Sequence, residues 1–121
     1  MLQNGISAQN DIIGMAMQAA SLANDVINNN IANVDVPGFK RSEVVFDTLL
    51  QNFVNTSRRG EASRPPTPQI VTQHANLSHR LDGNNVDIEA EMVALYQNSV
   101  RFDAMTAMLQ SNSRRNSLAY S

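Results

Sequence analysis

The spacing of apolar residues in the first third of the chain constrains the fold more than any other feature. From Asn10 to Val34, seam residues recur at alternating steps of three and four, the pattern of a helix that packs along a partner helix. The positions of this seam are Ile13, Met17, Ala20, Asn24, Ile27, Ile31 and Val34. Such a helix is about 36 Å long, more apolar edge than the loops of a small chain can cover. We expect a second helix to cover it.

The last third of the chain supplies a candidate for that second helix. Asp87 is suited to cap its start, and Glu89 and Glu91 fall in the first turn, where the helix dipole favours carboxylates. The same four-and-three spacing follows, in Ile88, Met92, Leu95, Ser99, Phe102, Thr106 and Leu109. The sequence therefore predicts an all-α fold in which two long terminal helices pair in the manner of a coiled coil. Asn24 would either fix the register as a buried amide or turn to the rim of the seam.

The middle of the chain predicts one short helix and little else that is regular. Pro37 and Gly38 should end the first helix in a turn. The spacing of Phe46, Leu49, Leu50 and Phe53 predicts a short third helix from Ser42 to about Asn55. Residues 56–86 are expected to form a loop or linker insert, because three prolines forbid a helix there and little can be buried. The chain is thus expected to be one domain, residues 1–121.

Two local signals stand out within this insert. Ile70, Val71 and Thr72 are suited to a brief strand, and the run from Asp82 to Asn85 reads Asp-Gly-Asn-Asn, a strong turn signal ahead of the last helix. Arg58, Arg59 and Arg64 form the one basic cluster of the sequence. This cluster is read either as a solvated loop or as a contact with an acidic neighbour.

Low charge indicates that large surfaces are hidden. Charged residues make up 17% of the chain, against about a quarter in an average protein. From Met1 to Val34 there is no Lys or Arg, and the acids are Asp11 and Asp25. Neutral amide and hydroxyl side chains suit helices that pack on several sides, because a buried amide is easier to satisfy than a buried charge. Chance variation in a short sequence is the other explanation. A helix pair with this much uncovered edge predicts a homo-oligomer.

Several function classes find no support in the sequence. The net charge of −2 disfavours nucleic acid, and the absence of Cys excludes disulfides and thiolate metal sites. No apolar run is long enough to span a membrane, and no ordinary cleaved signal is expected. His74 and His79 are read as structural or solvated, and Asp82 as part of a turn rather than a calcium loop. We therefore predict no catalytic, cofactor-binding or metal-ligating residue.

Two motifs carry a resemblance to a known family. Residues 30–40 read Asn-Ile-Ala-Asn-Val-Asp-Val-Pro-Gly-Phe-Lys, and residues 86–92 read Val-Asp-Ile-Glu-Ala-Glu-Met. In this order they resemble the two signatures of the bacterial flagellar rod and hook family of axial proteins. The residues that match are Asn30, Ile31, Ala32, Asn33, Pro37, Gly38, Phe39, Val86, Asp87, Glu91 and Met92. The family usually has Thr where this chain has Val36, so a hydroxyl bond across the turn would have to come from Asn33 or Asp35 instead.

The resemblance implies a structural subunit of the proximal rod with no chemistry or cofactor of its own. About fifty residues separate the two motifs, which implies an inner tube layer without an outer domain. The resemblance implies a location in the flagellar basal body and periplasm, helical self-assembly that transmits torque, and transit through the flagellar type III export apparatus. Implied partners are other rod proteins and, at the rod base, a FliE-type adaptor and the membrane ring. The alternatives are a coiled-coil adaptor or secretion chaperone, and a small enzyme, which would need a polar pocket.

Overall fold

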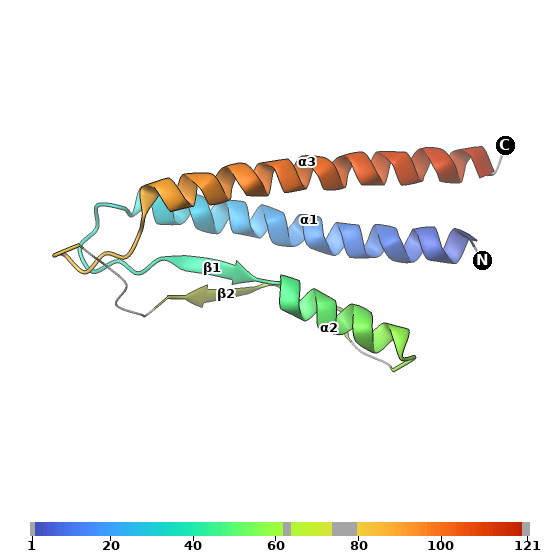
Figure 1. Cartoon of the computed structure of the whole chain (residues 1–121), viewed down its shortest axis with the longest axis horizontal. Coiled ribbons are helices and arrows are strands. Elements are labelled where there is room, and N and C mark those ends of the chain that lie inside the picture. Colours follow the sequence, from blue (N-terminus) through green and yellow to red (C-terminus); the bar gives the residue numbers. More distant parts are fainter. Residues whose placement is uncertain (1, 62–63, 74–79, 120–121) are drawn as a thin grey trace.

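The fold is a pair of long helices with a small strand pair and a short helix on one side. The computed structural model describes residues 2–61, 64–73 and 80–119. The elements, in chain order, are α1 (Leu2–Ala32), β1 (Ser42–Val45), α2 (Asp47–Arg58), β2 (Gln69–Thr72) and α3 (Ile88–Ala119). α1 and α3 lie side by side along their length, and both termini lie at the same end (Figure 1). The predicted pairing of the terminal helices and the short third helix are confirmed.

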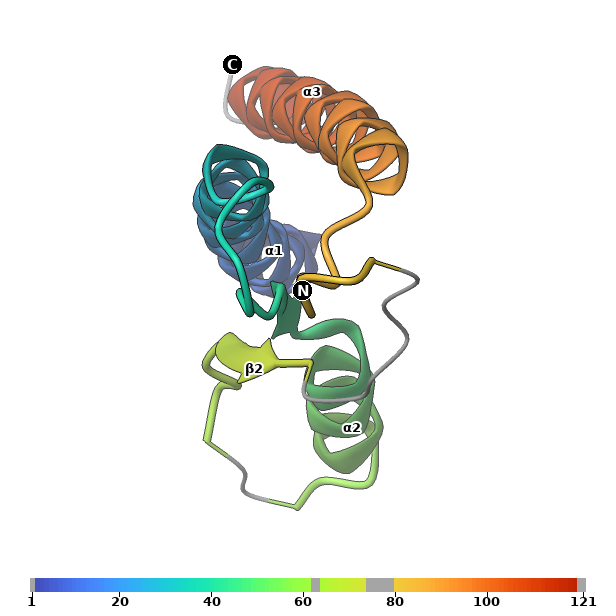
Figure 2. The ribbon, with the colours of Figure 1, turned by 90° about the vertical axis from the view of Figure 1, so that its left-hand side faces the viewer.

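The layers follow the order α3, α1 and then the strands with α2. Seen along the helix pair, α3 lies on one side of α1, while β2 and α2 lie on the other side (Figure 2). Among the described residues, the substantial contacts between elements join α1 to α3, α1 to β1 and β1 to β2. α1 is therefore covered from two directions, which explains why it carries so little charge. α2 takes part in none of these contacts.

The strand pair departs from the prediction at one point. Ser42 to Val45 were predicted to begin the third helix, but they form β1, and α2 begins at Asp47. β1 pairs antiparallel with β2, with Ser42 opposite Thr72 and Val45 opposite Gln69. The β-branched Val44 and Val45 suit an extended backbone, and the ladder with the partner strand holds it. The predicted strand at Ile70–Thr72 is confirmed and lies within β2.

The boundaries of α1 also differ slightly from the prediction. Helix was expected from Asn10 to Val34, after an irregular start, but α1 begins at Leu2 and ends at Ala32. The predicted α1 seam faces inward: every seam position is at least half-buried, and Ile13, Ala20 and Ile27 are buried. A second side of α1 is buried as well, through Ala19 and Val26. The single-seam pattern missed this second side because alanine carries little periodic signal.

The residues of α3 that pack against α1 differ from the predicted seam. At every second seam position, the residue that faces α1 is the one before the predicted residue. The apolar spacing assigned Met92, Ser99 and Thr106 to the side of α3 that packs on α1. The positions on that side are instead Glu91, Asn98 and Met105, followed by Asn112. Asn98 Nδ2 donates to the carbonyl oxygen of Ala20 at 2.7 Å, and Asn112 Nδ2 donates to Asn10 Oδ1 at 3.1 Å. Amides that bond across the helix pair are invisible to apolar periodicity, which explains the shift.

The other predicted α3 seam residues are divided between the two sides. Leu95 and Leu109 are half-buried, whereas Phe102, Ile88 and Met92 are exposed in the single chain. Ile88 and Met92 are therefore accessible to other molecules, whereas Phe102 lines a hollow together with Ala20 and Asn24 of α1. Their part in an assembly stays a prediction.

Candidate functional site

The two sequence motifs meet at the end of the helix pair opposite the termini (Figure 1). The C-terminal end of α1, the turn after it, the start of β1 and the N-terminal end of α3 converge there. Asn30 lies at the centre with no exposed surface. Its Nδ2 donates to the carbonyl oxygen of Ser42 at 2.7 Å and to Glu91 Oε2 at 3.2 Å, and its Oδ1 accepts from the Ser42 N–H at 2.9 Å. One amide thus fixes the first residue of β1 as a neighbouring strand would. We call this group of residues, Asn30, Arg41, Ser42, Glu91 and Asn84, the junction.

Glu91 brings a charge into the junction. Its side chain is 2% exposed, and its Oε1 accepts from Arg41 Nε at 2.6 Å. Burial of the Arg41 guanidinium acts to lower its pKa, but the hydrogen bond and charge of Glu91, helped by Glu43, outweigh burial and raise the pKa above its usual value. Arg41 is therefore cationic throughout the physiological range. A buried carboxylate held by two donors ties α1, β1 and α3 together.

Asn84 supplies the bonds that bridge the turn after α1. It has no exposed surface, and its Nδ2 donates to the carbonyl oxygens of Asn33 at 2.9 Å and Val36 at 2.8 Å. Its Oδ1 accepts from the Val86 N–H at 2.8 Å. The expectation that Asn33 or Asp35 would replace the missing hydroxyl was wrong for Asn33, because its Nδ2 donates back to the Asn29 carbonyl oxygen at 2.7 Å. A residue from the second motif region stabilises the turn of the first.

Two glycine turns interlock beside Asn84. Gly38 has a φ of 75° and Gly83 a φ of 79°, a region that L side chains rarely adopt. The Gly38 N–H donates to the carbonyl oxygen of Asp82 at 2.8 Å, and the Lys40 ammonium donates to the carbonyl oxygen of Gly83. The predicted turns at Pro37–Gly38 and Asp82–Asn85 are therefore both present, and each holds the other.

Asn85 joins the strand region to this pair of turns. Its Oδ1 accepts from the Arg41 N–H at 2.6 Å, and its Nδ2 donates to the carbonyl oxygen of Gln73 at 2.8 Å. Directly before α3, Asp87 Oδ1 accepts from the Glu89 N–H at 3.1 Å, so Asp87 is the N-cap that the sequence predicted. All of these hydrogen bonds hold segments of the backbone in place, so their role is structural.

The remaining motif residues surround the junction with different degrees of exposure. Val86 is buried, Ile31, Asn33 and Phe39 are half-buried, and Ala32, Pro37 and Met92 are exposed. The sequence analysis missed Arg41, Ser42, Asn84 and Asn85 as functional residues. The signal available for them was adjacency to the two motifs, since polar residues flanking a turn often bond to its backbone.

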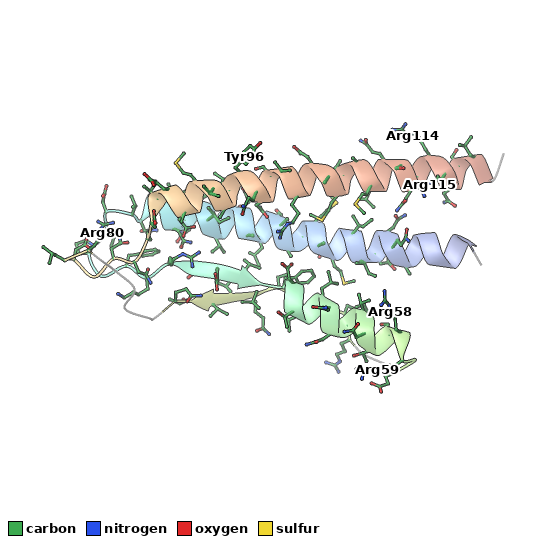
Figure 3. The ribbon with its side chains drawn as sticks, in the orientation of Figure 1. Arg58, Arg59, Arg80, Tyr96, Arg114 and Arg115 are labelled. Atoms are coloured by element: carbon green, nitrogen blue, oxygen red, sulfur yellow. The ribbon has the colours of Figure 1, made fainter. Side chains whose placement is uncertain are left out.

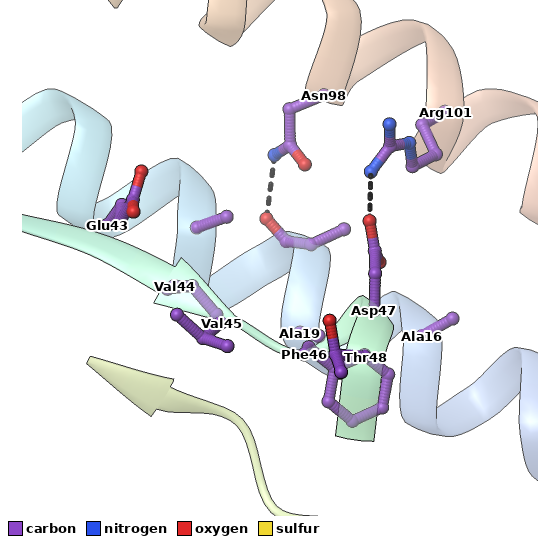
Figure 4. A pocket seen from close by; sticks show the side chains of 12 residues that line it. Ala16, Ala19, Glu43, Val44, Val45, Phe46, Asp47, Thr48, Asn98 and Arg101 are labelled. Atoms are coloured by element: carbon purple, nitrogen blue, oxygen red, sulfur yellow. Dashed lines mark hydrogen bonds and ion pairs between the residues drawn. The ribbon is translucent and has the colours of Figure 1, made fainter. Parts of the chain in front are cut away.

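A groove between α1, β1 and α3 has none of the marks of a catalytic pocket. It has a volume of about 280 Å³, and its lining includes Ala16, Ala19, Ala20 and Ala23 of α1. Figure 4 shows this groove from close by, with Ala16 and Ala19 labelled. Several polar groups at its edge are already engaged: Asn98 bonds to Ala20, Arg101 lies 3.8 Å from Asp47 Oδ2, and Glu43 lies 3.4 Å from Arg41 Nη1. Within residues 2–61, 64–73 and 80–119, no group of three or more His, Asp or Glu is placed to hold a metal. His74 and His79 lie outside the described residues.

The side of α3 that points away from α1 is apolar. Met92, Val93, Tyr96 and Val100 are between 50% and 72% exposed, and together they form what we call the outer face of α3. These positions lie on the helix side opposite Glu91 and Asn98, and Tyr96 points away from the rest of the molecule in Figure 3. In the described part of the chain, no helix is long and apolar enough to cross a membrane. A contiguous apolar patch on a chain of this size typically marks a contact with another protein.

Comparisons with known proteins agree with this structural reading. A family profile described as "Flagella basal body rod protein" matches residues 14–40, which include most of α1 and the turn after it. The chain is 32% identical to "Flagellar basal body rod protein FlgB" of Bacillus subtilis over 110 residues, covering 85% of this chain and 84% of that protein. It is 33% identical to the protein of the same name in Borreliella burgdorferi over 106 residues, covering 74% and 78%. The chain therefore belongs to the FlgB family of flagellar basal body rod proteins.

Proposed function

We propose that this chain is a subunit of the proximal rod in the bacterial flagellar basal body, where copies assemble helically and transmit motor torque through the periplasm. As a member of a family of rod proteins, it is structural rather than an enzyme. The observation that carries the proposal is the outer face of α3, whose four apolar side chains are at least half exposed in the single chain. Repeated contacts made by such faces are what build a tube from a small subunit.

The junction supports the torque-bearing part of the proposal. Torsion is transmitted only if the two helices cannot slide past each other, and sliding would break the bonds of Asn30, Glu91 and Asn84 together. Close-packed interiors with satisfied polar groups resist continuous deformation. We propose that the junction sets a fixed register between α1 and α3, so that each subunit behaves as a stiff strut.

The assembly seam follows from the same proposal. Seam residues of α1 serve the helix pair within the chain, whereas Ile88, Met92 and Phe102 of α3 are exposed and would serve contacts between subunits. We propose that residues 1–121 act as one inner-layer domain, with 56–86 as an insert. Neighbours would be other rod proteins above, a FliE-type adaptor and the membrane ring below, and the flagellar type III export apparatus during transit.

The concentration dependence of helicity tests the proposal against a secretion chaperone or coiled-coil adaptor. A rod subunit whose apolar face is covered by neighbours should gain helical circular dichroism and sedimentation coefficient as its concentration rises, and should form particles larger than a dimer. A chaperone should be helical at every concentration and stop at a dimer. A compact, fully helical monomer or dimer across the whole series would overturn the rod assignment. Recovery of the chain in extracted basal bodies, with density at the rod base, is the matching test in cells.

A further inference from the structure

We propose that Leu81 of one copy seats in a hollow between α1 and α3 near the termini of the next copy. The inference rests on the self-assembly proposed above and names a contact that would join subunits end to end. The knob is the tip of the molecule, formed by Arg80, Leu81 and Asp82. The hollow, which we call the terminal hollow, is lined by Ile12 and Ile13 of α1 and by Met108, Asn112 and Arg115 of α3.

Leu81 is an apolar side chain that its own chain leaves uncovered. It is fully exposed, with 109% of the reference accessible surface of a leucine. A single exposed leucine is ordinary, but this one is held in place by both neighbours in the sequence. The Arg80 guanidinium donates to the Val34 carbonyl oxygen, and the Asp82 carbonyl oxygen accepts from the Gly38 N–H at 2.8 Å. The tip is therefore fixed to the turn after α1 and presents Leu81 outward.

The terminal hollow is suited to receive an apolar side chain. It has a volume of about 420 Å³, and its lining comes from α1 and α3 alone. Ile12 and Ile13 supply one wall, and Met108, which is 52% exposed, supplies the other. Apolar walls on both sides release water when an apolar side chain enters between them, and this release favours the contact.

The terminal hollow continues a groove that the chain fills with its own side chain on the other half of the helix pair. Ala19 and Arg101 line the groove beside β1, whereas Ile12 and Met108, each seven residues away, line the terminal hollow. Seven residues are about two helical turns, so each pair lies on one side of its helix. Phe46 packs into the groove and is 5% exposed. In the described part of the chain, no such residue enters the terminal hollow.

The occupant must come from another molecule. Arg80 of the tip and Arg115 of the terminal hollow lie toward opposite ends of the helix pair (Figure 3). The span of α1 from Gln9 to Ala32 is 23 residues, or about 35 Å, so the tip cannot reach the hollow of its own chain. Two different patches at opposite ends of a subunit make a head-to-tail contact, which repeats without closing unless the rotation forms a ring.

Charge complementarity selects a second copy as the occupant. Asp35 is exposed in the turn to which the tip is bonded, and Arg115 lines the terminal hollow. Among the described residues, neither side chain has an ion-pair partner. Arg80 and Asp82, which flank Leu81, pair with each other at 2.9 Å and so add no net charge to the tip. Seating of the tip would bring the Asp35 carboxylate to the Arg115 guanidinium of the next copy.

Cysteine cross-linking tests the contact directly, because the natural chain has no cysteine. Two full-length variants are mixed, one with Leu81→Cys and one with Met108→Cys, and oxidised at assembling concentration. The expected product is a disulfide-linked heterodimer of the two variants. The matched control replaces Met108→Cys by Gln110→Cys, which is exposed but lies about half a turn around α3, and should give about fivefold less product.

A charge exchange tests the alignment of the two ends. Asp35→Arg and Arg115→Asp should each weaken self-association about fivefold in sedimentation, and the double variant should restore it. The control combines Asp35→Arg with Arg114→Asp, which changes charge equally near the end of α3 but outside the terminal hollow, and should not restore association. Circular dichroism of each variant checks that the helix pair still forms.

Truncation of the knob separates assembly from folding. Leu81→Ser should weaken self-association about tenfold, because the apolar side chain that fills the terminal hollow is lost. The same change should leave the thermal midpoint of the dilute chain unaltered, because Leu81 has no packing to lose within its own chain. Unchanged association would show that the tip does not take part in the contact.

The outcomes separate this inference from the proposed function. If the chain assembles but Leu81→Cys links to Met108→Cys no better than to the control, the seating of the tip is wrong while the rod assignment stands. Equal rescue by Arg115→Asp and Arg114→Asp would likewise overturn the seating. If the chain does not assemble at all, both proposals are wrong. Preferential linkage together with rescue by Arg115→Asp supports the end-to-end contact.

Discussion

At the scale of single residues, a few side chains make the hydrogen bonds that connect segments distant in the chain. Glu91, Asn30 and Asn84 each bond to segments more than forty residues away in sequence. Each is nearly or wholly buried, and each has its polar atoms satisfied. Such groups contribute little when intact and cost much when one partner is removed, because the remaining partner is left buried without a bond.

Glu91→Ala is expected to lower the free energy of unfolding by about 2 kcal/mol. The loss removes one of the two acceptors of Asn30 Nδ2 and the acceptor of Arg41 Nε, and it is moderated because Asn30 keeps its bonds to Ser42, Arg41 keeps Glu43, and the Arg41 side chain is 27% exposed. Urea titration followed by circular dichroism measures the change. The matched control is Glu89→Gln, an exposed change two residues away that should cost about 0.5 kcal/mol or less. Equal stability of the two variants would show that the ion pair does not hold the junction.

Gly38→Ala isolates the cost of backbone conformation. The φ of 75° is unfavourable for L residues, yet a Cβ at this position would meet no atom within 4 Å. We expect a loss of about 1 kcal/mol in the free energy of unfolding, from conformation alone. Gly38→Asn should cost less, because Asn tolerates this region better than Ala. Thermal melting of the two variants gives the comparison, and a larger loss for Asn than for Ala would contradict it.

At the scale of the elements, the strength of packing differs sharply between β1 and α2. Phe46, at the join of the two, is 5% exposed and lines the groove against α1. Phe53, two helical turns further on, is only half-buried. β1 and Phe46 therefore pack on α1, whereas β2 is exposed on the far side of β1 and α2 projects from the helix pair (Figure 3).

Two matched substitutions should expose this difference. Phe46→Ala is expected to cost about 3 kcal/mol of unfolding free energy, because it leaves a cavity against α1. Phe53→Ala should cost less than about 1 kcal/mol when the chain is too dilute to associate. Urea titrations at low concentration measure both. Similar losses for both would mean that α2 is packed as firmly as β1.

The elements also show how far sequence reasoning reaches. The seam of α1, the N-cap Asp87 and the turn at Pro37–Gly38 follow from local rules of spacing and capping, and the structure has them. The strand at Ser42–Val45 and the amide-lined side of α3 do not, because both depend on partners distant in the chain. Apolar spacing reports which side of a helix avoids water, but α3 has an apolar side that its own chain leaves uncovered. The pattern therefore mixed residues from two sides of α3, Leu95 on one and Met92 on the other.

At the scale of the whole molecule, the two long helices are held together by many hydrogen bonds at one end and by fewer at the other. Every bond of the junction lies at the end that carries the two turns. Toward the termini, Asn112 Nδ2 meets Asn10 Oδ1 at 3.1 Å across 102 residues of sequence. Separation of the helices should therefore begin near the termini, where fewer groups must part at once.

A cross-link at that contact should hold the pair closed. Asn10→Cys with Asn112→Cys is expected to form a disulfide, which constrains the unfolded chain by about 4.7 kcal/mol for a loop of roughly 100 residues. The oxidised chain should keep its helical circular dichroism at dilutions where the reduced chain loses it. The single variant Asn10→Cys, treated with the same oxidant, is the control. No difference between oxidised and reduced double variants would mean that the terminal ends do not limit the stability of the pair.

The N-terminal and C-terminal ends of the chain leave the molecule side by side (Figure 1). Any fluorescent or affinity tag therefore projects from the same place, whichever end it is fused to, and changing ends does not relieve crowding there. A tag inserted after Gly60, in the exposed bend that follows α2, would instead project from the side of the subunit that carries α2 (Figure 1). Comparing these fusions for motility would map which flank is open to the surroundings in a finished organelle.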